Sequence, residues 1–234
     1  MKRLLFLLIP AALLSQTGSQ TGNQTIPAGF PFTDESLTYS INWPGGLGLG
    51  ESHLRAHRAG AEWNFEMTID AGIPGYQVKD YYRSVASAAF CSTVFNRNSS
   101  HGLKKVEEKE IIASGEVTRS TLHEGGESHI VAPECLKDAL DFLFFARREL
   151  GQGRMPATQP VLFGGLTPLS FVYAGEQTIK LADKPAVTDK VDCSVKTSNS
   201  QVKFEIYFAR DATRTPLLVR APLAAGTFSM EIVR

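Results

Sequence analysis

The sequence has few cysteines, no excess of charge of either sign and only one long apolar run. Three cysteines in 234 residues are too few for a small scaffold held together by disulfides. Lysine plus arginine and aspartate plus glutamate number 24 each, so no basic surplus indicates a nucleic-acid-binding protein. Beyond residue 15, no apolar stretch reaches the ~18 residues of a membrane-spanning helix. We therefore expect no nucleic acid partner and no transmembrane segment in the mature chain.

What remains is the composition of an ordinary globular protein. Hydrophobic residues make up 43% of the chain and charged residues 21%, which excludes an intrinsically disordered protein. The length suits one domain with a core large enough to fold without disulfide support.

The N-terminus has the features of an export signal. Lys2 and Arg3 precede an apolar run at residues 4–14. As a helix this run would span about 16 Å, well short of the ~30 Å hydrocarbon layer of a membrane. Residues 1–15 are therefore predicted to be a cleaved signal peptide, and the Gln/Thr/Gly-rich residues 16–31 a flexible lead-in. This predicts a soluble protein that is periplasmic or secreted.

Alternation of apolar and polar residues dominates the rest of the chain. Trp63, Phe65 and Met67 alternate with polar residues, and the same period recurs at 202–208. Such alternation places one face of a strand on a core and the other in water, which is typical of antiparallel sheets. Glycine- and proline-containing turns separate the strands at hairpin spacing. The pattern predicts a mainly β fold of about a dozen strands, with residues 32–234 in a single domain.

One helix is predicted among these strands, at Cys135–Leu150, with Gly151 closing it. Phe142, Phe144 and Phe145 widen its stripe of leucines well beyond one face. Such a helix needs cover on most sides, because burying four of its large side chains contributes roughly 6–12 kcal/mol. We therefore expect a curved antiparallel sheet, or half-barrel, wrapped around one apolar helix.

The three cysteines, Cys91, Cys135 and Cys193, permit three different single disulfides, each leaving one thiol over. An oxidising compartment allows a bridge without requiring one. Cys193 alternates with Val191 and Val195, so its side chain is predicted to face inward from a strand. Cys135 stands at the N-terminal end of the predicted helix, where the helix dipole would favour a reactive thiolate. The favoured interpretation is buried, apolar cysteines with at most one pair.

Several short segments resemble one protein family by their order along the chain. They are Leu37–Trp43, Gly48–Glu51, Val78–Ser84, the helix Asp138–Leu150 with Gly151, and Asp211–Leu217 after a strand near the end. Over roughly Phe32 to Arg234 the chain resembles the uncharacterised bacterial envelope family called domain of unknown function 3108 (DUF3108). The resemblance implies an exported, antiparallel β-rich protein akin to half-barrel lipoprotein carriers. It implies no established activity and no catalytic residues.

Residue types that bind metals do not form a recognisable site. The segment His123–His129 imitates the zinc-protease helix motif, but Glu127 stands where a histidine is required and Gly125-Gly126 opposes a helix. As a hairpin with a two-residue turn, it would place its two histidines on different faces. His53 and His57 are four apart on a predicted strand, about 13 Å, which is too far for one zinc ion. We therefore predict no metal and no cofactor.

Signatures of catalysis are also missing. No Gly-x-Ser-x-Gly nucleophile motif occurs, and Gly45–Gly50 has neither dinucleotide-binding spacing nor a phosphate-binding lysine.

Two charged segments have structural interpretations. The mixed charges of Lys104–Glu110 are interpreted as a solvated edge strand. Arg214 lies in a turn ending at Pro216, where it would bind a carboxylate or phosphate, or, in the favoured interpretation, pair with Asp211.

Three functional hypotheses follow. The first is a non-enzymatic carrier for a hydrophobic or amphipathic envelope molecule such as a lipid, with Phe142, Phe144, Phe145 and Arg214 as candidate ligand contacts. The second is a structural or assembly partner of another envelope protein, bound through an exposed sheet edge. The third is a hydrolase whose residues come from distant positions, for which no catalytic residue is nominated.

Overall fold

The computed structural model describes residues 34–121, 125–196, 201–223 and 226–233. The predicted signal peptide and lead-in lie outside these residues. The elements are β1 (Asp34–Asn42), β2 (Gly48–Ala59), β3 (Glu62–Ile73), β4 (Tyr76–Ser87), β5 (Ser92–His101), β6 (Lys104–Ala113), β7 (Glu116–Thr121), β8 (Gly126–Val131), β9 (Lys137–Asp138), α1 (Ala139–Gly151), β10 (Gln159–Leu162), β11 (Leu166–Leu181), β12 (Lys184–Lys196), β13 (Gln201–Ala209), β14 (Pro216–Leu223) and β15 (Gly226–Ile232).

All fifteen strands belong to one sheet, in the order β8-β7-β6-β5-β4-β3-β2-β1-β15-β14-β13-β12-β11-β10-β9. Neighbouring strands are antiparallel, except that β9 and β10 run parallel. Antiparallel pairing of β1 with β15 joins the beginning of the described chain to its end. The predicted mainly β, antiparallel fold is confirmed, although the sheet has fifteen strands instead of about a dozen.

The prediction missed the shortest strands. The two-residue β9 and the four-residue β10 carry too few residues to show alternation. In addition, the sequence pattern predicts two separate strands at residues 169–173 and 177–181, but both belong to one strand, β11, whose pairing with β12 shifts register at Gly175. A glycine there, with φ of 100°, permits the irregularity that hides the continuity of the strand.

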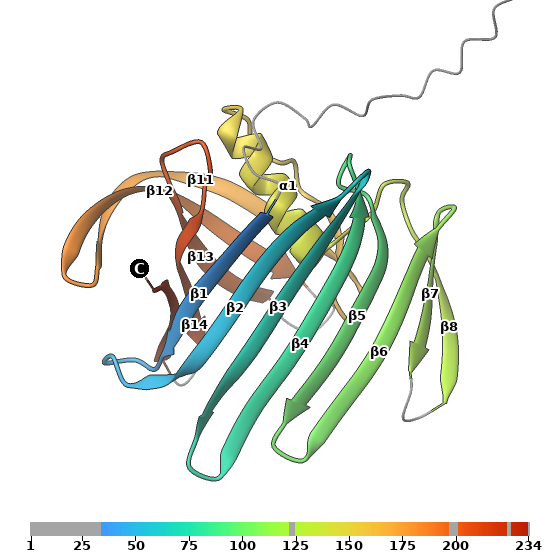
Figure 1. Ribbon diagram of the computed structural model, residues 1–234, viewed down its shortest axis with the longest axis horizontal. Coiled ribbons are helices and arrows are strands. Elements are labelled where there is room, and N and C mark those ends of the chain that lie inside the picture. The colour runs from blue at the N-terminus through green and yellow to red at the C-terminus, as the bar shows by residue number, and fades with distance from the viewer. Residues whose placement is uncertain (1–33, 122–124, 197–200, 224–225, 234) are drawn as a thin grey trace, which may run out of the picture.

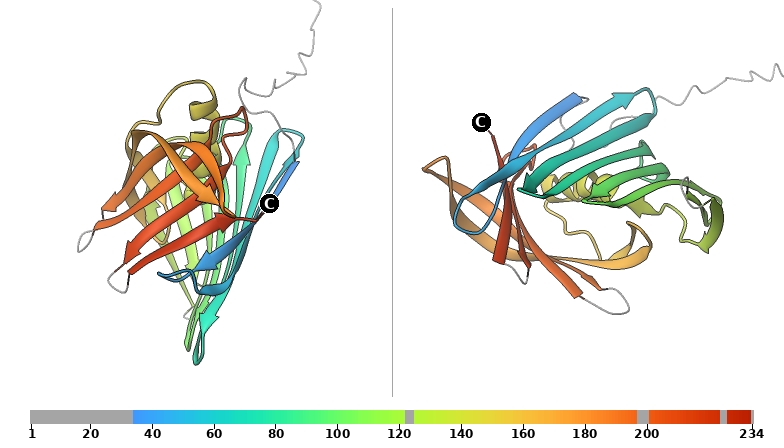
Figure 2. Two further views of the ribbon diagram at one scale, coloured as in Figure 1. Left: turned by 90° about the vertical axis from the view of Figure 1, so that its left-hand side faces the viewer. Right: turned by 90° about the horizontal axis from the view of Figure 1, so that it is seen from below.

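The sheet curls around α1, as predicted (Figure 1). Figure 2 shows the helix between a first wall, β1–β5, and a second wall, β10–β13. The curl brings the β9 end of the sheet back to the first wall, where the Ser92 amide donates to the Leu136 carbonyl at 2.9 Å. Val117 and Leu162 lie in one buried cluster and fill the space between β7 and β10. The result is a barrel-like half shell.

The helix packs against both walls. Leu140 and Phe144 join the buried cluster of the first wall, and Phe142, Ala146 and Leu150 join that of the second. Because these two groups lie on different faces of the helix, nearly its whole circumference is covered, as its composition requires. Its burial in the concavity is thereby confirmed.

The helix begins four residues later than predicted. Lys137–Asp138 forms β9, and Asp138 is the N-cap: its side chain accepts hydrogen bonds from the amides of Leu140 at 2.9 Å and Asp141 at 3.0 Å. Leu136, which the prediction placed in the helical stripe, is buried beside β10. The apolar residues between 136 and 140 therefore belong to the approach to β9 and to the first turn of the helix, not to one continuous helix.

Cys91 and Cys135 form a disulfide, and Cys193 is free and buried. The bridge fastens the turn between β4 and β5 to the segment that enters β9. Cys193 faces inward from β12, as its alternation with valines predicted. Cys135 has no free thiol, so the alternative of a reactive cysteine before the helix is wrong.

Lys104–Glu110 is not an edge strand. It belongs to β6, which pairs with β5 along its length and with β7 from Glu108 onward. The edges of the sheet are β8 and β9. Two of the charges on β6 have partners on neighbouring strands, since Glu110 pairs with Arg119 and Glu108 lies near Arg97.

Candidate ligand-binding groove

An apolar groove of about 480 Å³ lies between α1 and the inner face of the second wall. A volume of this size suits an organic ligand. The residues that line it are Ala139, Phe142, Leu143, Val161, Phe163, Thr167, Leu169, Phe171, Cys193, Val195, Val202, Phe204 and Ile206. Thr167 is the only polar residue among them, so the groove offers dispersion contacts and very few hydrogen bonds.

Strand alternation explains why the groove is apolar. On β11, Leu169 and Phe171 face the groove, whereas Val172 lies on the opposite face and is 56% exposed. Cys193 pairs with Phe171 in register, so their side chains adjoin on the same face. The inward residues of the second wall therefore form one continuous hydrophobic surface.

The helix supplies the facing side of the groove. The Phe142 ring makes an edge-on contact with Phe171, with centroids 5.7 Å apart, and is 3% exposed. Leu143 contacts the clusters of both walls and also lines the groove. These contacts form the groove from side chains that are already ordered by the core.

The other two helix phenylalanines lie elsewhere. Phe144 is fully buried and stacks on Phe65 with centroids 4.3 Å apart, in the core of the first wall. Phe145 is half-buried beneath two cations: Lys137 Nζ lies 4.5 Å and Arg148 Cζ 4.9 Å from its ring centroid. Of the three predicted aromatic contacts, only Phe142 is among the residues that line the groove.

Arg214 is held in an ion pair away from the groove lining. Its guanidinium contacts the Asp189 carboxylate, while its backbone amide donates to Asp211 Oδ1 at 3.2 Å. The favoured side-chain pairing with Asp211 is therefore wrong, although Asp211 does hold the turn through backbone amides. The side chain reaches Asp189 because β12 and β13 pair along their length and bring the turn after β13 beside Asp189.

Sequence reasoning missed most of the groove residues, which come from β10 to β13. Phe163 at the end of β10 is the most informative of them, because it is 49% exposed although it lines the groove. Its ring also approaches Tyr82 on the first wall, with centroids 5.5 Å apart. The signal available in the sequence was a phenylalanine directly before the flexible pair Gly164-Gly165.

Cys193 places a thiol in the groove wall. The residue is 3% exposed, and burial raises the pKa of the thiol. The side chain is therefore neutral at physiological pH and behaves as a small apolar group.

A cluster of buried acids lies at the start of the helix, outside the groove lining. Asp138 accepts from Ser84, and Asp141 Oδ2 accepts from the Ser92 hydroxyl at 2.9 Å. Burial raises the pKa of Asp138 to about 6 and that of Asp141 well above its usual range. Burial also lowers the pKa of neighbouring Lys137. The hydrogen bonds of this cluster fix the start of α1 against β4 and β5.

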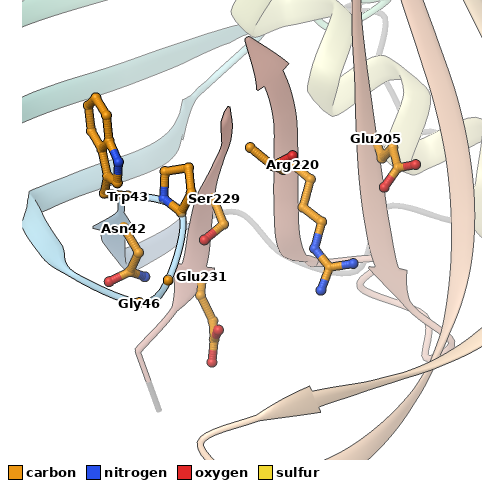
Figure 3. A pocket seen from close by; sticks show the side chains of 10 residues that line it. Asn42, Trp43, Gly46, Glu205, Arg220, Ser229 and Glu231 are labelled. Carbon is orange, nitrogen blue, oxygen red and sulfur yellow. The ribbon is translucent and has the colours of Figure 1, made fainter. Parts of the chain in front are cut away.

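A second hollow of about 610 Å³ lies on the outer face of the sheet, between the β1–β2 turn and β13–β15. Figure 3 shows Arg220 between Glu205 and Glu231 in this hollow. Glu205 already pairs with Lys190 at 2.6 Å and accepts from Tyr207 at 2.7 Å. The hollow is thus polar and internally paired, and it is separated from the groove by the sheet, since Ile206 and Glu205 face opposite ways.

No group of three or more metal-ligating side chains gathers in the described part of the chain. His129 pairs with Thr118 and Gly126 pairs with Thr121, so the register differs from that of a hairpin whose turn is Gly125-Gly126. Its nearest partners are carboxylates, with Nδ1 3.0 Å from Glu116. His123 lies outside the described residues. Among those residues, no helix is long and apolar enough to cross a membrane.

The sequence matches the family described as "Protein of unknown function (DUF3108)" over residues 38–233. The chain belongs to the DUF3108 family. The resemblance drawn from its short segments is therefore confirmed. The match covers every strand from β2 to β15 and all of α1, so the groove lies within the part shared with DUF3108. No curated protein matches the sequence.

Among solved structures, this DUF3108 chain is similar to a beta-barrel-like protein of domain of unknown function DUF1849 from Brucella abortus. The TM-score is 0.63 at 8% identity, with 88% of this chain and 98% of that one covered. This likeness supports the barrel-like fold alone. The lipoprotein LppX of Mycobacterium tuberculosis is also matched, at 11% identity over 85% of this chain and 84% of that one. Its TM-score of 0.29 is too low to support an argument.

Proposed function

We propose that this protein is a non-enzymatic, exported binding or carrier module for a molecule with a long apolar chain, such as a lipid. The observation that carries the proposal is the groove of about 480 Å³ between α1 and the second wall, whose lining is almost wholly apolar. Binding sites for small molecules are concave, largely apolar and mostly preformed. Phe142 is the predicted ligand contact that we retain, together with Phe171 and Phe204.

The chemistry of the lining favours an alkyl chain as the occupant. Transfer of an apolar surface from water into such a groove releases about 0.8 kcal/mol for each buried CH₂ group. The single polar lining residue, Thr167, provides little to recognise a polar molecule or to carry out a reaction on it. An apolar groove of this kind therefore supports storage or transport better than catalysis.

A pair of tryptophan variants tests this proposal. Cys193→Trp fills the groove from its wall, whereas Val172→Trp adds the same side chain to the exposed opposite face of the neighbouring strand. We expect wild type and Val172→Trp to take up a fluorescent long-chain fatty acid saturably, with about one molecule per chain. Cys193→Trp should lose this uptake. Absence of saturable uptake by folded wild type, or equal uptake by both variants, would refute the proposal.

The edge of β8 supports a second candidate, a structural partner of another envelope protein. β8 is the last strand of the sheet, and Val131 at its end is 88% exposed. An unpaired edge of this kind is able to accept a strand from another protein. Val131→Lys should then abolish crosslinking to an envelope partner while leaving fatty acid uptake intact. If crosslinking persists in that variant, β8 is not the contact.

A further inference from the structure

One arginine beside the groove has unused hydrogen-bonding capacity. Arg97 on β5 lies with its guanidinium carbon 5.8 Å from the ring centroid of Phe163, which lines the groove. The guanidinium also lies against the turn that follows β10, because a Cβ at Gly164 would come within 2.8 Å of Nη1. Arg97 therefore stands where an apolar chain would pass Phe163 and leave the groove.

The side chain of Arg97 is partly buried and incompletely paired. It is 24% exposed, and its Nε is buried without a hydrogen-bond partner among the described residues. The carboxylate of Glu108 on β6 lies 3.7 Å from Nη1, which is too long for a hydrogen bond. The burial of Nε without a hydrogen-bond partner carries an energetic cost, which an anionic oxygen group bound to the guanidinium would relieve.

Two other arginines of the described chain are already paired with carboxylates. Arg119, also on the inner face, donates to Glu110 Oε1 at 2.6 Å. Arg214, the arginine selected from the sequence as an anion ligand, pairs with Asp189. Tyr82, whose ring touches Phe163, is neutral because burial raises its pKa to about 12. Arg97 is thus the cation at Phe163 with hydrogen-bond donors to spare.

We propose that Arg97 binds the anionic oxygen group, a carboxylate or a phosphate, of an amphiphile whose apolar chain lies in the groove. This inference rests on the proposed function and adds the class of ligand. Glu108 lies beside the guanidinium but does not occupy its N–H donors, so these donors stay available to a ligand. Gly164 keeps free the space into which the guanidinium extends.

Three probes with comparable chains and different heads test the proposal on the purified protein. They are oleate, oleyl alcohol and oleoyl lysophosphatidic acid, with affinities measured by displacement of a fluorescent fatty acid. Wild type should bind oleate about tenfold or more tightly than oleyl alcohol, because a hydrogen-bonded charge pair adds to the contacts of the chain. Tighter binding of lysophosphatidic acid than of oleate would identify phosphate as the preferred group, and the reverse order would identify carboxylate.

Variants of the ion pair separate a ligand-binding role from a structural one. Arg97→Gln should weaken oleate binding about tenfold or more and leave oleyl alcohol binding unchanged, and Arg97→Lys should restore part of the loss. Glu108→Gln should keep or tighten oleate binding, because it removes a negative charge beside the ligand. Circular dichroism and the thermal midpoint of each variant show that the comparison is made on folded protein.

The two proposals fail in different ways. If wild type binds oleate and oleyl alcohol equally and Arg97→Gln changes neither, the role of Arg97 is refuted and the groove remains a binding site. Equal losses of oleate affinity in Arg97→Gln and Glu108→Gln would likewise refute it, because they would show a purely structural ion pair. If folded wild type binds none of the three probes, the proposed function itself is refuted.

Discussion

At the scale of single residues, the fold depends on a few charged groups buried beside the helix. Arg147 is 1% exposed and donates to the two carboxylate oxygens of Glu35 at 2.6 and 2.9 Å. It also donates to the Thr213 carbonyl from Nε at 3.2 Å and from Nη2 at 3.0 Å. One guanidinium thereby connects α1 with β1 and with the turn before β14.

Removal of this guanidinium should be costly. Arg147→Met leaves the Glu35 carboxylate, which is 13% exposed, without its bidentate partner. Breaking a buried ion pair in this way costs about 3–5 kcal/mol, measured as the free energy of unfolding in urea. The double variant Arg147→Met/Glu35→Leu should recover part of the loss, since neither charge remains. A single variant as stable as wild type would show that the pair contributes nothing.

The buried acids predict an unusual dependence of stability on pH. The pKa of Asp138 is raised to about 6 and that of Asp141 lies well above its usual range, in both cases mainly because of burial. Between about pH 7 and pH 4 the folded state binds protons that the unfolded chain, with ordinary aspartate pKa values near 3.9, does not. The free energy of unfolding should therefore rise as the pH falls through this window.

Urea titrations at pH 7 and pH 5 measure this effect. We expect wild type to gain roughly 1–3 kcal/mol on acidification. Asp141→Asn should reduce the gain, because Asp141 Oδ1 has no hydrogen-bond partner among the described residues and its charge is unfavourable there. If wild type and Asp141→Asn lose stability equally between pH 7 and pH 5, the raised pKa values assigned to the buried aspartates are wrong.

At the scale of elements, the helix presents chemically similar side chains to different environments. Phe144 belongs to the core of the first wall, whereas Phe142 belongs to the groove. Phe144→Ala should destabilise the protein by about 3–5 kcal/mol through loss of a fully buried ring. Phe142→Ala should weaken fatty acid uptake more than Phe144→Ala does, when both are measured well below their unfolding midpoints. The opposite order of uptake would place the ligand on the other side of the helix.

The disulfide joins two elements that the sheet also brings together. Cys91 and Cys135 are 44 residues apart in sequence and fasten the β4–β5 turn to the entry of β9. Closing a loop of this length restricts the unfolded chain, so Cys91→Ser/Cys135→Ser should cost about 2–5 kcal/mol. Wild type should lose a similar amount in dithiothreitol, and the double variant should not respond to it. Equal stability with and without reductant would contradict this role for the bridge.

Most elements were predictable because their signals are local. Alternation identifies a strand such as β3 from its own residues, and the wide apolar surface of α1 requires a concave partner wherever that partner lies. The short strand β9 was mistaken for helix because two residues carry no period, and because Asp138 acts as an N-cap only once β9 has paired with β10.

At the scale of the whole molecule, the groove depends on information that no local pattern contains. Its lining comes from α1 and from strands that extend over the last third of the chain. The helical period shows that Phe142 and Phe144 face different ways, but the curl of the sheet decides which one meets a filled core and which a groove. Arg97 reaches the groove from β5 for the same reason, since the curl brings Phe163 back to the first wall.

The most direct measurement of groove occupancy is methyl NMR of the purified protein during titration with oleate. Val161, Val195 and Ile206 have methyl groups at the groove, whereas Leu54 and Val117 are buried elsewhere. We predict saturable shifts of the first three methyl signals and nearly constant signals for the other two. Unchanged groove signals at saturating oleate, or shifts confined to Leu54 and Val117, would contradict binding in the groove.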